Sequence, residues 1–249
     1  MRRYLFYLGV LFLAVFFSIP SAFSAPEKKA GILILARGND PPGEVSLWDK
    51  SVMDAVEPIQ KQYDTELVFG EDRNKLQDAV NRLESRGAER ILAIPLYISF
   101  HSPVVQILEY LLGITSEPPQ MQREEQPITI KADLHMCHAM EHHPFAAEIL
   151  LERTVEISRA PSKEIVVLVA HGPTTEKAET LWLRSMWTLS SYVKEKGGFK
   201  DATVATIMFG AAPEIKDKAN KEFRELVEKK GKEGDVLVMP CVLAPGGIE

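Results

Sequence analysis

The sequence has few cysteines, no excess of basic residues and, after its first 24 residues, no long apolar run. With only two cysteines in 249 residues, the protein cannot be built on a disulfide framework. Its formal net charge of −6 and the lack of a basic stripe argue against nucleic-acid binding. The two cysteines, Cys137 and Cys241, both follow predicted strands, so a single bridge between them stays open.

Two common catalytic motifs are also absent. A phosphate-binding loop needs a lysine directly after its last glycine, whereas Gly246-Gly247 is followed by isoleucine. Ser99 and Ser102 have no surrounding pattern of histidine and acid that would activate a serine nucleophile. The sequence therefore predicts neither a P-loop nucleotide hydrolase nor a serine hydrolase.

The N-terminal segment has the order of a secretory signal peptide. Two arginines precede an apolar run over residues 4–17, and small residues follow at Ala22 and Ser24. An uncleaved membrane anchor is the alternative, but the run is shorter than the roughly 20 residues that span a bilayer. We expect cleavage before Ala25, which removes residues 1–24 and both arginines. The exported, periplasmic protein would then have 225 residues, a net charge of −8 and no stable membrane span.

The remaining chain repeats a pattern of three landmarks. Each copy has a residue directly after a buried strand, a tryptophan eleven residues later, and a proline that ends a further strand. The landmarks are Arg37, Trp48 and Pro95 in the first copy and His171, Trp182 and Pro240 in the second. The offset between copies is 134 residues at the first landmark and 145 at the last. This regularity predicts a duplicated α/β unit, in which an arginine of one copy replaces the histidine of the other.

Apolar runs alternate with helical patterns, which predicts βαβ units and parallel sheets. The expected strands cover residues 31–36, 65–69, 91–100, 128–134, 165–170, 202–208 and 235–240. The expected helices cover residues 47–59, 76–83, 104–112, 144–157, 177–195 and 214–230. We place an N-terminal half at residues 29–160 and a C-terminal half at residues 161–249. By symmetry the C-terminal half is short of a helix, a strand and a final helix. Either this half is naturally shorter or the sequence is a fragment, and we expect a fragment.

His171 is the first candidate for chemistry, because ligands of open α/β sheets bind beyond the carboxyl ends of the strands. An imidazole in this place can accept a proton near neutral pH or bind a transition metal, although it can also serve only to cap the turn. Two further strand ends converge on the same edge. They supply His101 and Glu249 as candidate metal ligands that accompany His171.

Residues 135–143 form a second candidate site. This nine-residue segment holds four histidines, two methionines and a cysteine, a density of donors that favours a transition-metal or haem site. The candidate ligands are His135, Cys137, His138 and His142. His138 and His142 are four residues apart and would share one face of a helix. The alternative is a loop that leads into a helix, with His143 directly before the first helical proline.

The order of landmarks resembles the class II tetrapyrrole chelatases, and more narrowly the sirohydrochlorin cobaltochelatase group. The resemblance rests on a strand followed by His-Gly-Pro, the downstream Leu-Trp pair, and the run Met-Pro-Cys-Val-Leu-Ala-Pro-Gly-Gly-Ile-Glu at residues 239–249. It implies two flavodoxin-like, three-layer αβα halves with a cleft between them. It also implies ATP-independent insertion of Co²⁺ or Fe²⁺, as substrate, into a tetrapyrrole such as sirohydrochlorin.

The resemblance assigns roles residue by residue. His171 matches the family's base and metal ligand, whereas Arg37 stands where many relatives have a histidine and would instead pair with a carboxylate of the tetrapyrrole. The neighbouring glycines of the strand-end turns would form the rest of the substrate site; these are Gly38, Gly172, Gly246 and Gly247. The competing hypothesis is a non-catalytic periplasmic carrier that binds metal or haem through residues 135–143. The sequence leaves open the metal, the tetrapyrrole and whether the protein forms a homo-oligomer.

Overall fold

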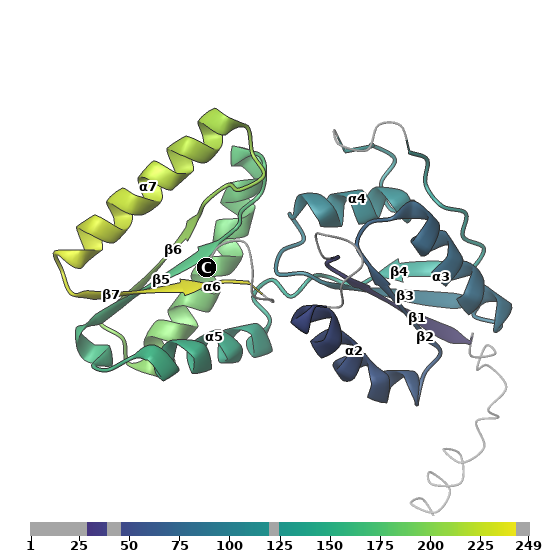
Figure 1. Cartoon of the computed structure of the whole chain (residues 1–249), viewed down its shortest axis with the longest axis horizontal. Coiled ribbons are helices and arrows are strands. Elements are labelled where there is room, and N and C mark those ends of the chain that lie inside the picture. The colour runs from purple at the N-terminus through teal and green to yellow at the C-terminus, as the bar shows by residue number, and fades with distance from the viewer. Residues whose placement is uncertain (1–28, 39–45, 120–124, 243–249) are drawn as a thin grey trace, which may run out of the picture.

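The computed structural model of the chain describes residues 29–38, 46–119 and 125–242. Over these residues the protein forms two α/β lobes that lie side by side (Figure 1). The predicted signal peptide lies outside the described residues, as do Gly246, Gly247 and Glu249. None of the described helices combines the length and the apolar character needed to cross a membrane.

The N-terminal lobe contains a parallel four-stranded sheet with the strand order β2-β1-β3-β4. Its strands are β1 (Ala30–Ala36), β2 (Thr65–Phe69), β3 (Arg90–Leu96) and β4 (Asp133–Met136). Its helices are α2 (Leu47–Gln60), α3 (Arg73–Ser85) and α4 (Pro103–Leu111). Helix α2 packs on one face of the sheet through Val52 and Val56, and α3 and α4 pack on the other. The expected α/β fold with three layers is therefore confirmed for this half.

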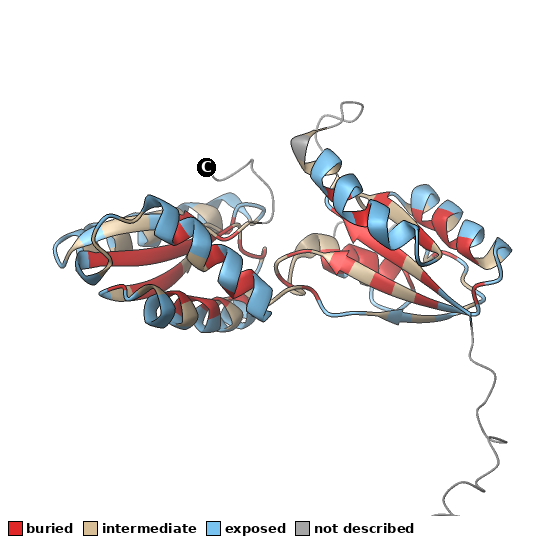
Figure 2. Cartoon of the chain, turned by 90° about the horizontal axis from the view of Figure 1, so that it is seen from below, coloured by how far each residue is buried: buried red, intermediate tan, exposed pale blue. Residues whose placement is uncertain are grey.

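The C-terminal lobe has a parallel three-stranded sheet with the strand order β6-β5-β7. Its strands are β5 (Glu164–Ala170), β6 (Asp201–Thr206) and β7 (Asp235–Pro240), and a short 3₁₀ helix, η1 (Pro161–Lys163), precedes them. Its helices are α5 (Pro144–Ile157), α6 (Glu176–Gly197) and α7 (Pro213–Gly231). Every residue of β5 is buried, which explains the uninterrupted apolar run in the sequence. Figure 2 shows the buried strands enclosed by the exposed outer faces of the helices.

The two sheets have matching strand registers. Ala30 of β1 pairs with Arg90 of β3, and the residue 134 positions after Ala30, Glu164, pairs with Asp235, 145 positions after Arg90. These are the two offsets read from the sequence landmarks. Alternate residues of β1 and β5 therefore face equivalent layers, so that α2 and α6 cover equivalent faces of the two sheets.

Helix α5 belongs to the C-terminal lobe, although it precedes the predicted boundary between the halves at residues 160 and 161. Ala146, Ala147 and Leu150 pack into the C-terminal core against α6 and β7. Small residues on this face allow the helix backbone to come close to its neighbours. The N-terminal half of the sequence thus contributes one outer helix to the other lobe (Figure 1).

One expected strand is misplaced. The alternation over 128–134 predicts a strand there, but β4 covers only Asp133–Met136. The preceding residues are bonded by side chains of α3: Gln77 bonds both backbone groups of Thr129, and Glu84 accepts from the amides of Lys131 and Ala132. Side chains of a helix therefore take the place of the strand ladder, and alternation alone cannot distinguish the two.

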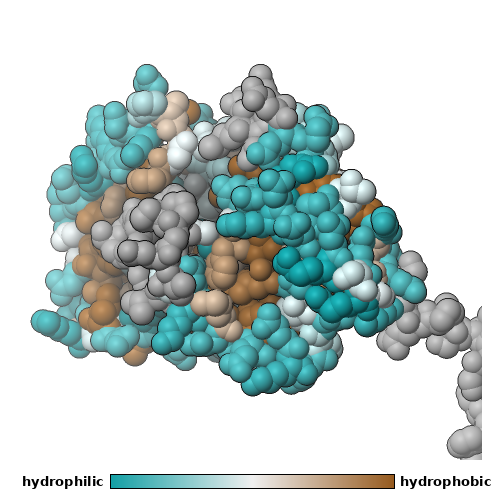
Figure 3. Space-filling view, turned by 45° about the vertical axis from the view of Figure 1, so that its right-hand side comes forward, coloured by the Kyte–Doolittle hydropathy of each residue, from teal (hydrophilic) through white to brown (hydrophobic). Residues whose placement is uncertain are grey.

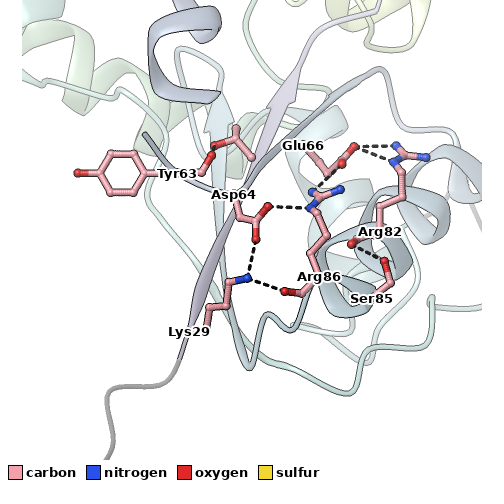
Figure 4. Close-up of polar contacts among 8 residues, drawn as sticks. Lys29, Tyr63, Asp64, Glu66, Arg82, Ser85 and Arg86 are labelled. Carbon is pink, nitrogen blue, oxygen red and sulfur yellow. Dashed lines mark hydrogen bonds and ion pairs between the residues drawn. The ribbon is translucent and has the colours of Figure 1, made fainter. Parts of the chain in front are cut away.

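An ion-pair network ties α3 to the start of β2, at the end of the N-terminal sheet opposite to the strand end that precedes Arg37 (Figure 4). Arg86 donates to Asp64 at 2.7 Å and to Glu66 at 2.8 Å, and Arg82 also pairs with Glu66 at 2.8 Å. Hydrogen bonds from Lys29 and Arg86 lower the pKa of Asp64. Partial burial would raise the pKa of Glu66, but its hydrogen bonds to the two arginines outweigh that effect and lower it.

Replacing Arg86 with alanine is expected to lower the free energy of unfolding at pH 7 by about 1 kcal/mol, allowing for solvent screening of these partly exposed groups. Because both carboxyl pKa values are lowered on folding, the stabilisation is present above their ordinary values of 3.8 and 4.5. It is lost as the pH falls through the lower folded values. Urea unfolding at pH 7 and pH 3 should therefore show a gap between wild type and variant that narrows at the lower pH. A gap of equal size at both pH values would contradict an ionic origin.

Candidate functional site

A cleft of about 310 Å³ lies where the two lobes meet, at the carboxyl ends of their strands. It is lined by segments that follow β1, β3, β5, β6 and β7, together with residues of α2, α4 and α6. The lining is mostly apolar and includes the side chains of Trp48, Trp182 and Phe209. In Figure 3 a hydrophobic area is visible near the middle of the face shown, with hydrophilic surface on its right and below it. The volume lies within the range of small-molecule sites.

The cleft walls consist largely of equivalent residues from the two lobes. Four pairs related by the 134- and 145-residue offsets line it together: Arg37 and His171, Trp48 and Trp182, Leu96 and Cys241, and Tyr97 and Val242. The N-terminal lobe therefore contributes a guanidinium and a phenol where the C-terminal lobe contributes an imidazole and an apolar side chain. The site is asymmetric in chemistry although its backbone frame is nearly symmetric.

His171 follows β5 directly and lines the cleft, as the sequence predicted. Its position depends on Gly172, which has a φ of +74°. A Cβ atom at residue 172 would lie 2.7 Å from Cβ of Thr206, at the end of the neighbouring strand β6. Only glycine allows the chain to turn this close to β6. The His-Gly motif alone did not reveal that Gly172 is needed for this close approach.

Phe209 lies beside His171 and narrows the access to it. The centres of the two rings are 5.5 Å apart, and the amide of Phe209 donates to the backbone oxygen of His171 at 3.0 Å. On the other side, Nζ of Lys216 lies 4.5 Å from the centre of the Phe209 ring, a cation–π contact. The preceding residue, Met208, has a φ of +46° and is buried. Phe209 therefore forms a wall that shields one side of His171 from solvent.

Arg37 lies opposite, after β1, with an exposed side chain at the cleft. Its backbone oxygen accepts a hydrogen bond of 3.2 Å from Nε1 of Trp48. At Gly38 a Cβ atom would lie 3.1 Å from Cα of Gly70, so the ends of β1 and β2 approach closely in the same way as the ends of β5 and β6. The guanidinium carried by this backbone can bind a carboxylate that enters the cleft.

Two buried donors in the cleft were not identified from the sequence. Tyr97 is 7% exposed and Trp182 is 5% exposed, and within the described residues neither Oη of Tyr97 nor Nε1 of Trp182 has a hydrogen-bond partner. Burial raises the pKa of Tyr97, the nearby Glu71 raises it further, and Arg37 opposes this. The phenol therefore stays protonated and can donate. The only feature of the sequence that could have indicated Tyr97 is its position two residues after Pro95, where a predicted strand reaches the cleft.

Cys137 and Cys241 are both free cysteines, so the bridge left open by the sequence is absent. Cys241 is buried in the cleft wall, and burial raises the pKa of its thiol to about 12. Cys137 is exposed. Since only the thiolate is a strong nucleophile, the two thiols differ in both access and ionisation.

Iodoacetamide at pH 8 is expected to modify Cys137 completely while Cys241 remains unmodified over the same period, and both thiols should react in urea. Mass spectrometry of the digested protein measures the two sites separately. In the Cys137→Ser variant, the folded protein should take up no label. Rapid labelling of that folded variant would show that the thiol of Cys241 is open to solvent.

Of the other two predicted ligands, His101 does not join His171 in the cleft lining, and Glu249 is not tested. His101 lies in the turn between β3 and α4, and it is not among the residues found to line the cleft. Glu249, Gly246 and Gly247 lie outside the described residues. The described part of the site therefore contains a single imidazole.

The segment 135–143 does not form the predicted helical face. His135 lies in β4, 3.3 Å from Asp133, and residues 137–143 form a loop and a turn. His143 caps α5, where its Nδ1 accepts from the amide of Phe145 at 3.3 Å, and the ring of His138 packs near Phe100. Across the described ranges, no three His, Cys, Asp or Glu side chains converge to hold a metal ion. The prediction that His138 and His142 share one face of a helix is therefore wrong. The segment is a loop that leads into helix α5, which was the alternative.

The architecture of this chain is similar to that of solved structures. SirB from Bacillus subtilis, in a structure with Fe³⁺, superposes with a TM-score of 0.59, covering 88% of this chain and 79% of SirB at 15% identity. The sirohydrochlorin chelatase SirB from Bacillus subtilis subspecies spizizenii, in complex with cobalt, matches over 85% of this chain and 87% of its own, with a TM-score of 0.48 and 11% identity. No family model and no curated protein sequence matches the chain.

The chain has the fold of SirB. This fold confirms the architecture expected from the sequence: two similar α/β halves with parallel sheets. At 15% identity the likeness concerns the fold, so the chemistry has to be argued from the cleft itself.

Proposed function

We propose that this protein inserts Co²⁺ or Fe²⁺ into a tetrapyrrole held in the cleft between its two lobes, without ATP. The observation that carries the proposal is His171: an imidazole at the carboxyl end of a central strand, in a mostly apolar cleft, on a fold shared with SirB. The metal is a substrate in this reaction and is passed on to the macrocycle.

Insertion exchanges two pyrrole N–H protons for one divalent metal ion. The neutral imidazole of His171 accepts one of these protons as the metal–nitrogen bonds form, and the second leaves to solvent. An imidazole also binds Co²⁺ or Fe²⁺ with intermediate strength, which allows the metal to move on to the macrocycle. A thiolate would compete too strongly for such metals, and the raised pKa of Cys241 keeps its thiol protonated.

The remaining groups of the cleft suit a flat ligand with carboxylates at its edge. Trp48 and Trp182 offer apolar surface from opposite lobes, and Arg37 offers a bidentate partner for a carboxylate. Oη of Tyr97 and Nε1 of Trp182 supply two further donors, and buried donors normally find an acceptor. A macrocycle that carries acidic side chains provides such acceptors around an apolar centre.

The alternative is a periplasmic carrier that binds metal or haem through residues 135–143 without insertion. It loses support because the described side chains of that segment do not converge on one point. Two of them have structural contacts of their own, since His143 caps a helix and His135 pairs with Asp133. The proposed location, the periplasm, rests on the charged and apolar N-terminal segment of the sequence.

The test is anaerobic insertion by the protein that begins at Ala25, with sirohydrochlorin and Co²⁺ or Fe²⁺, followed by the change in absorbance of the macrocycle. A rate well above a protein-free control would support the enzyme. If no insertion occurs while the protein retains metal or haem through gel filtration, the carrier replaces it. Absence of both properties would reject the two functions together.

A further inference from the structure

Glu141 lies in the segment that links β4 to α5, where the chain passes from one lobe to the other. Its carboxylate is bonded on both sides of the passage. One oxygen accepts from Oγ of Ser99 at 3.2 Å and from the amide of Phe100 at 2.5 Å. The other oxygen accepts from Oγ of Ser185, on α6, at 2.5 Å. A single side chain therefore connects the loop after β3 to the longest helix of the C-terminal lobe.

The backbone around Glu141 is held as firmly as its side chain. The amide of Met140 donates to the oxygen of Tyr97 at 2.9 Å, and the amide of Glu141 donates to the oxygen of Ile98 at 2.7 Å. Glu141 also has a φ of +44°, a left-handed conformation that is unfavourable for residues other than glycine. Because its side chain accepts three hydrogen bonds, the surroundings of Glu141 hold its backbone in this unfavourable conformation.

Both ends of this connection belong to the walls of the cleft. Ser99 lines the cleft itself, next to Tyr97 and Ile98 on the same loop. Ser185 lies one helical turn after Trp182, which lines the cleft from the opposite lobe. The bonds of Glu141 thus fix the position of one wall relative to the other.

We infer that Glu141 is a positioning residue that sets the width of the cleft by joining the loop after β3 to α6. Its effect on catalysis rests on the proposed insertion reaction, whereas its effect on the distance between the lobes does not. Glu141 does not line the cleft, so it acts on a ligand only through Ser99, Tyr97 and Trp182.

Four variants separate the connection from general stability. Glu141→Ala removes all three bonds, and Ser185→Ala removes only the bond to α6. Glu141→Gln retains an oxygen that accepts from the Phe100 amide and an amide that donates to Ser185, so it should restore most of the wild-type behaviour. Glu152→Ala, on an exposed face of α5, is the matched control.

The first measurement is the distance between spin labels at Asp54→Cys on α2 and Glu228→Cys on α7, with Cys137 replaced by serine. Asp54 and Glu228 are exposed, and the buried Cys241 can be retained. We expect the distance distribution to broaden in Glu141→Ala and Ser185→Ala and to stay unchanged in Glu152→Ala. Adding Ser185→Ala to Glu141→Ala should cause no further change, because the bond is already absent. An unchanged distribution in both single variants would overturn the inference, whether or not the protein inserts metal.

The second measurement is steady-state insertion of Co²⁺ into sirohydrochlorin. A displaced wall should raise KM for the macrocycle about tenfold or more, with a smaller change in kcat, because His171 itself is untouched. A merely destabilised protein would show fewer active molecules, hence a lower kcat at an unchanged KM. That second pattern, with no rescue by Glu141→Gln, would contradict the role of Glu141 in positioning. If the wild-type protein inserts no metal, the proposed function is rejected. The distance measurement then decides by itself on the role of Glu141.

Discussion

Insertion of metal into sirohydrochlorin is expected to slow at least about 100-fold when His171 is replaced with alanine, because general base catalysis by a positioned side chain is typically worth a factor of that size or more. His171 is the imidazole in the described lining of the cleft, and no other described residue there is a histidine. The measurement is the initial rate of the absorbance change under anaerobic conditions, after subtraction of the protein-free rate.

His101→Ala and His135→Ala are the matched controls for this prediction. Both remove an imidazole that does not line the cleft, so we expect each to retain the wild-type rate within about threefold. Circular dichroism should show that all three variants are folded. A His171→Ala variant with the wild-type rate would remove His171 from the mechanism. A large loss with His101→Ala would instead show that the loop after β3 brings a second imidazole to the reacting metal.

The largest effect on stability is expected for Gly172→Ala, which should lower the free energy of unfolding by about 2 to 5 kcal/mol. A left-handed conformation costs an alanine about 1 to 2 kcal/mol. Overlap in a packed region adds about 1 to 3 kcal/mol, and the new Cβ would lie 2.7 Å from Cβ of Thr206. Denaturant unfolding of the purified variant gives this difference directly.

Gly113 provides the control, because it has a similar φ of +72° and no neighbour within 4 Å of an added Cβ. Gly113→Ala should therefore show only the backbone contribution of about 1 to 2 kcal/mol. The difference between the two variants measures the contact between the ends of β5 and β6. Equal losses at both positions would mean that Thr206 moves away at no cost, and that the close approach at Gly172 is not required.

Much of the fold follows from local patterns. Strands β1 and β5 are almost fully buried, so their sequences are unbroken apolar runs that a parallel sheet requires. The tryptophans eleven residues after Arg37 and His171 mark equivalent helices, and the equivalent prolines mark equivalent strands. Since a parallel sheet gathers its carboxyl ends at one edge, the position of His171 at a site could also be predicted.

The two predictions that failed, the strand over 128–134 and the helical face within 135–143, have a common cause. The alternation at 128–134 is satisfied by side chains of α3 instead of a neighbouring strand, and the histidines of 135–143 are dispersed because that segment is a connection between lobes. Local spacing does not say which partner will satisfy a backbone group. It also does not say whether donors that are close in sequence point toward one another.

The sequence by itself determined the α/β class, the two related halves and the strand end that carries His171, because burial periodicity and turn chemistry are local properties. Only the tertiary structure decided that α5 packs on the opposite lobe, that Tyr97 and Trp182 face one cleft, and that Glu141 joins its two walls. Those features depend on contacts between residues tens of positions apart. The free energy of such contacts comes from packing and hydrogen bonding between lobes, which no local pattern encodes.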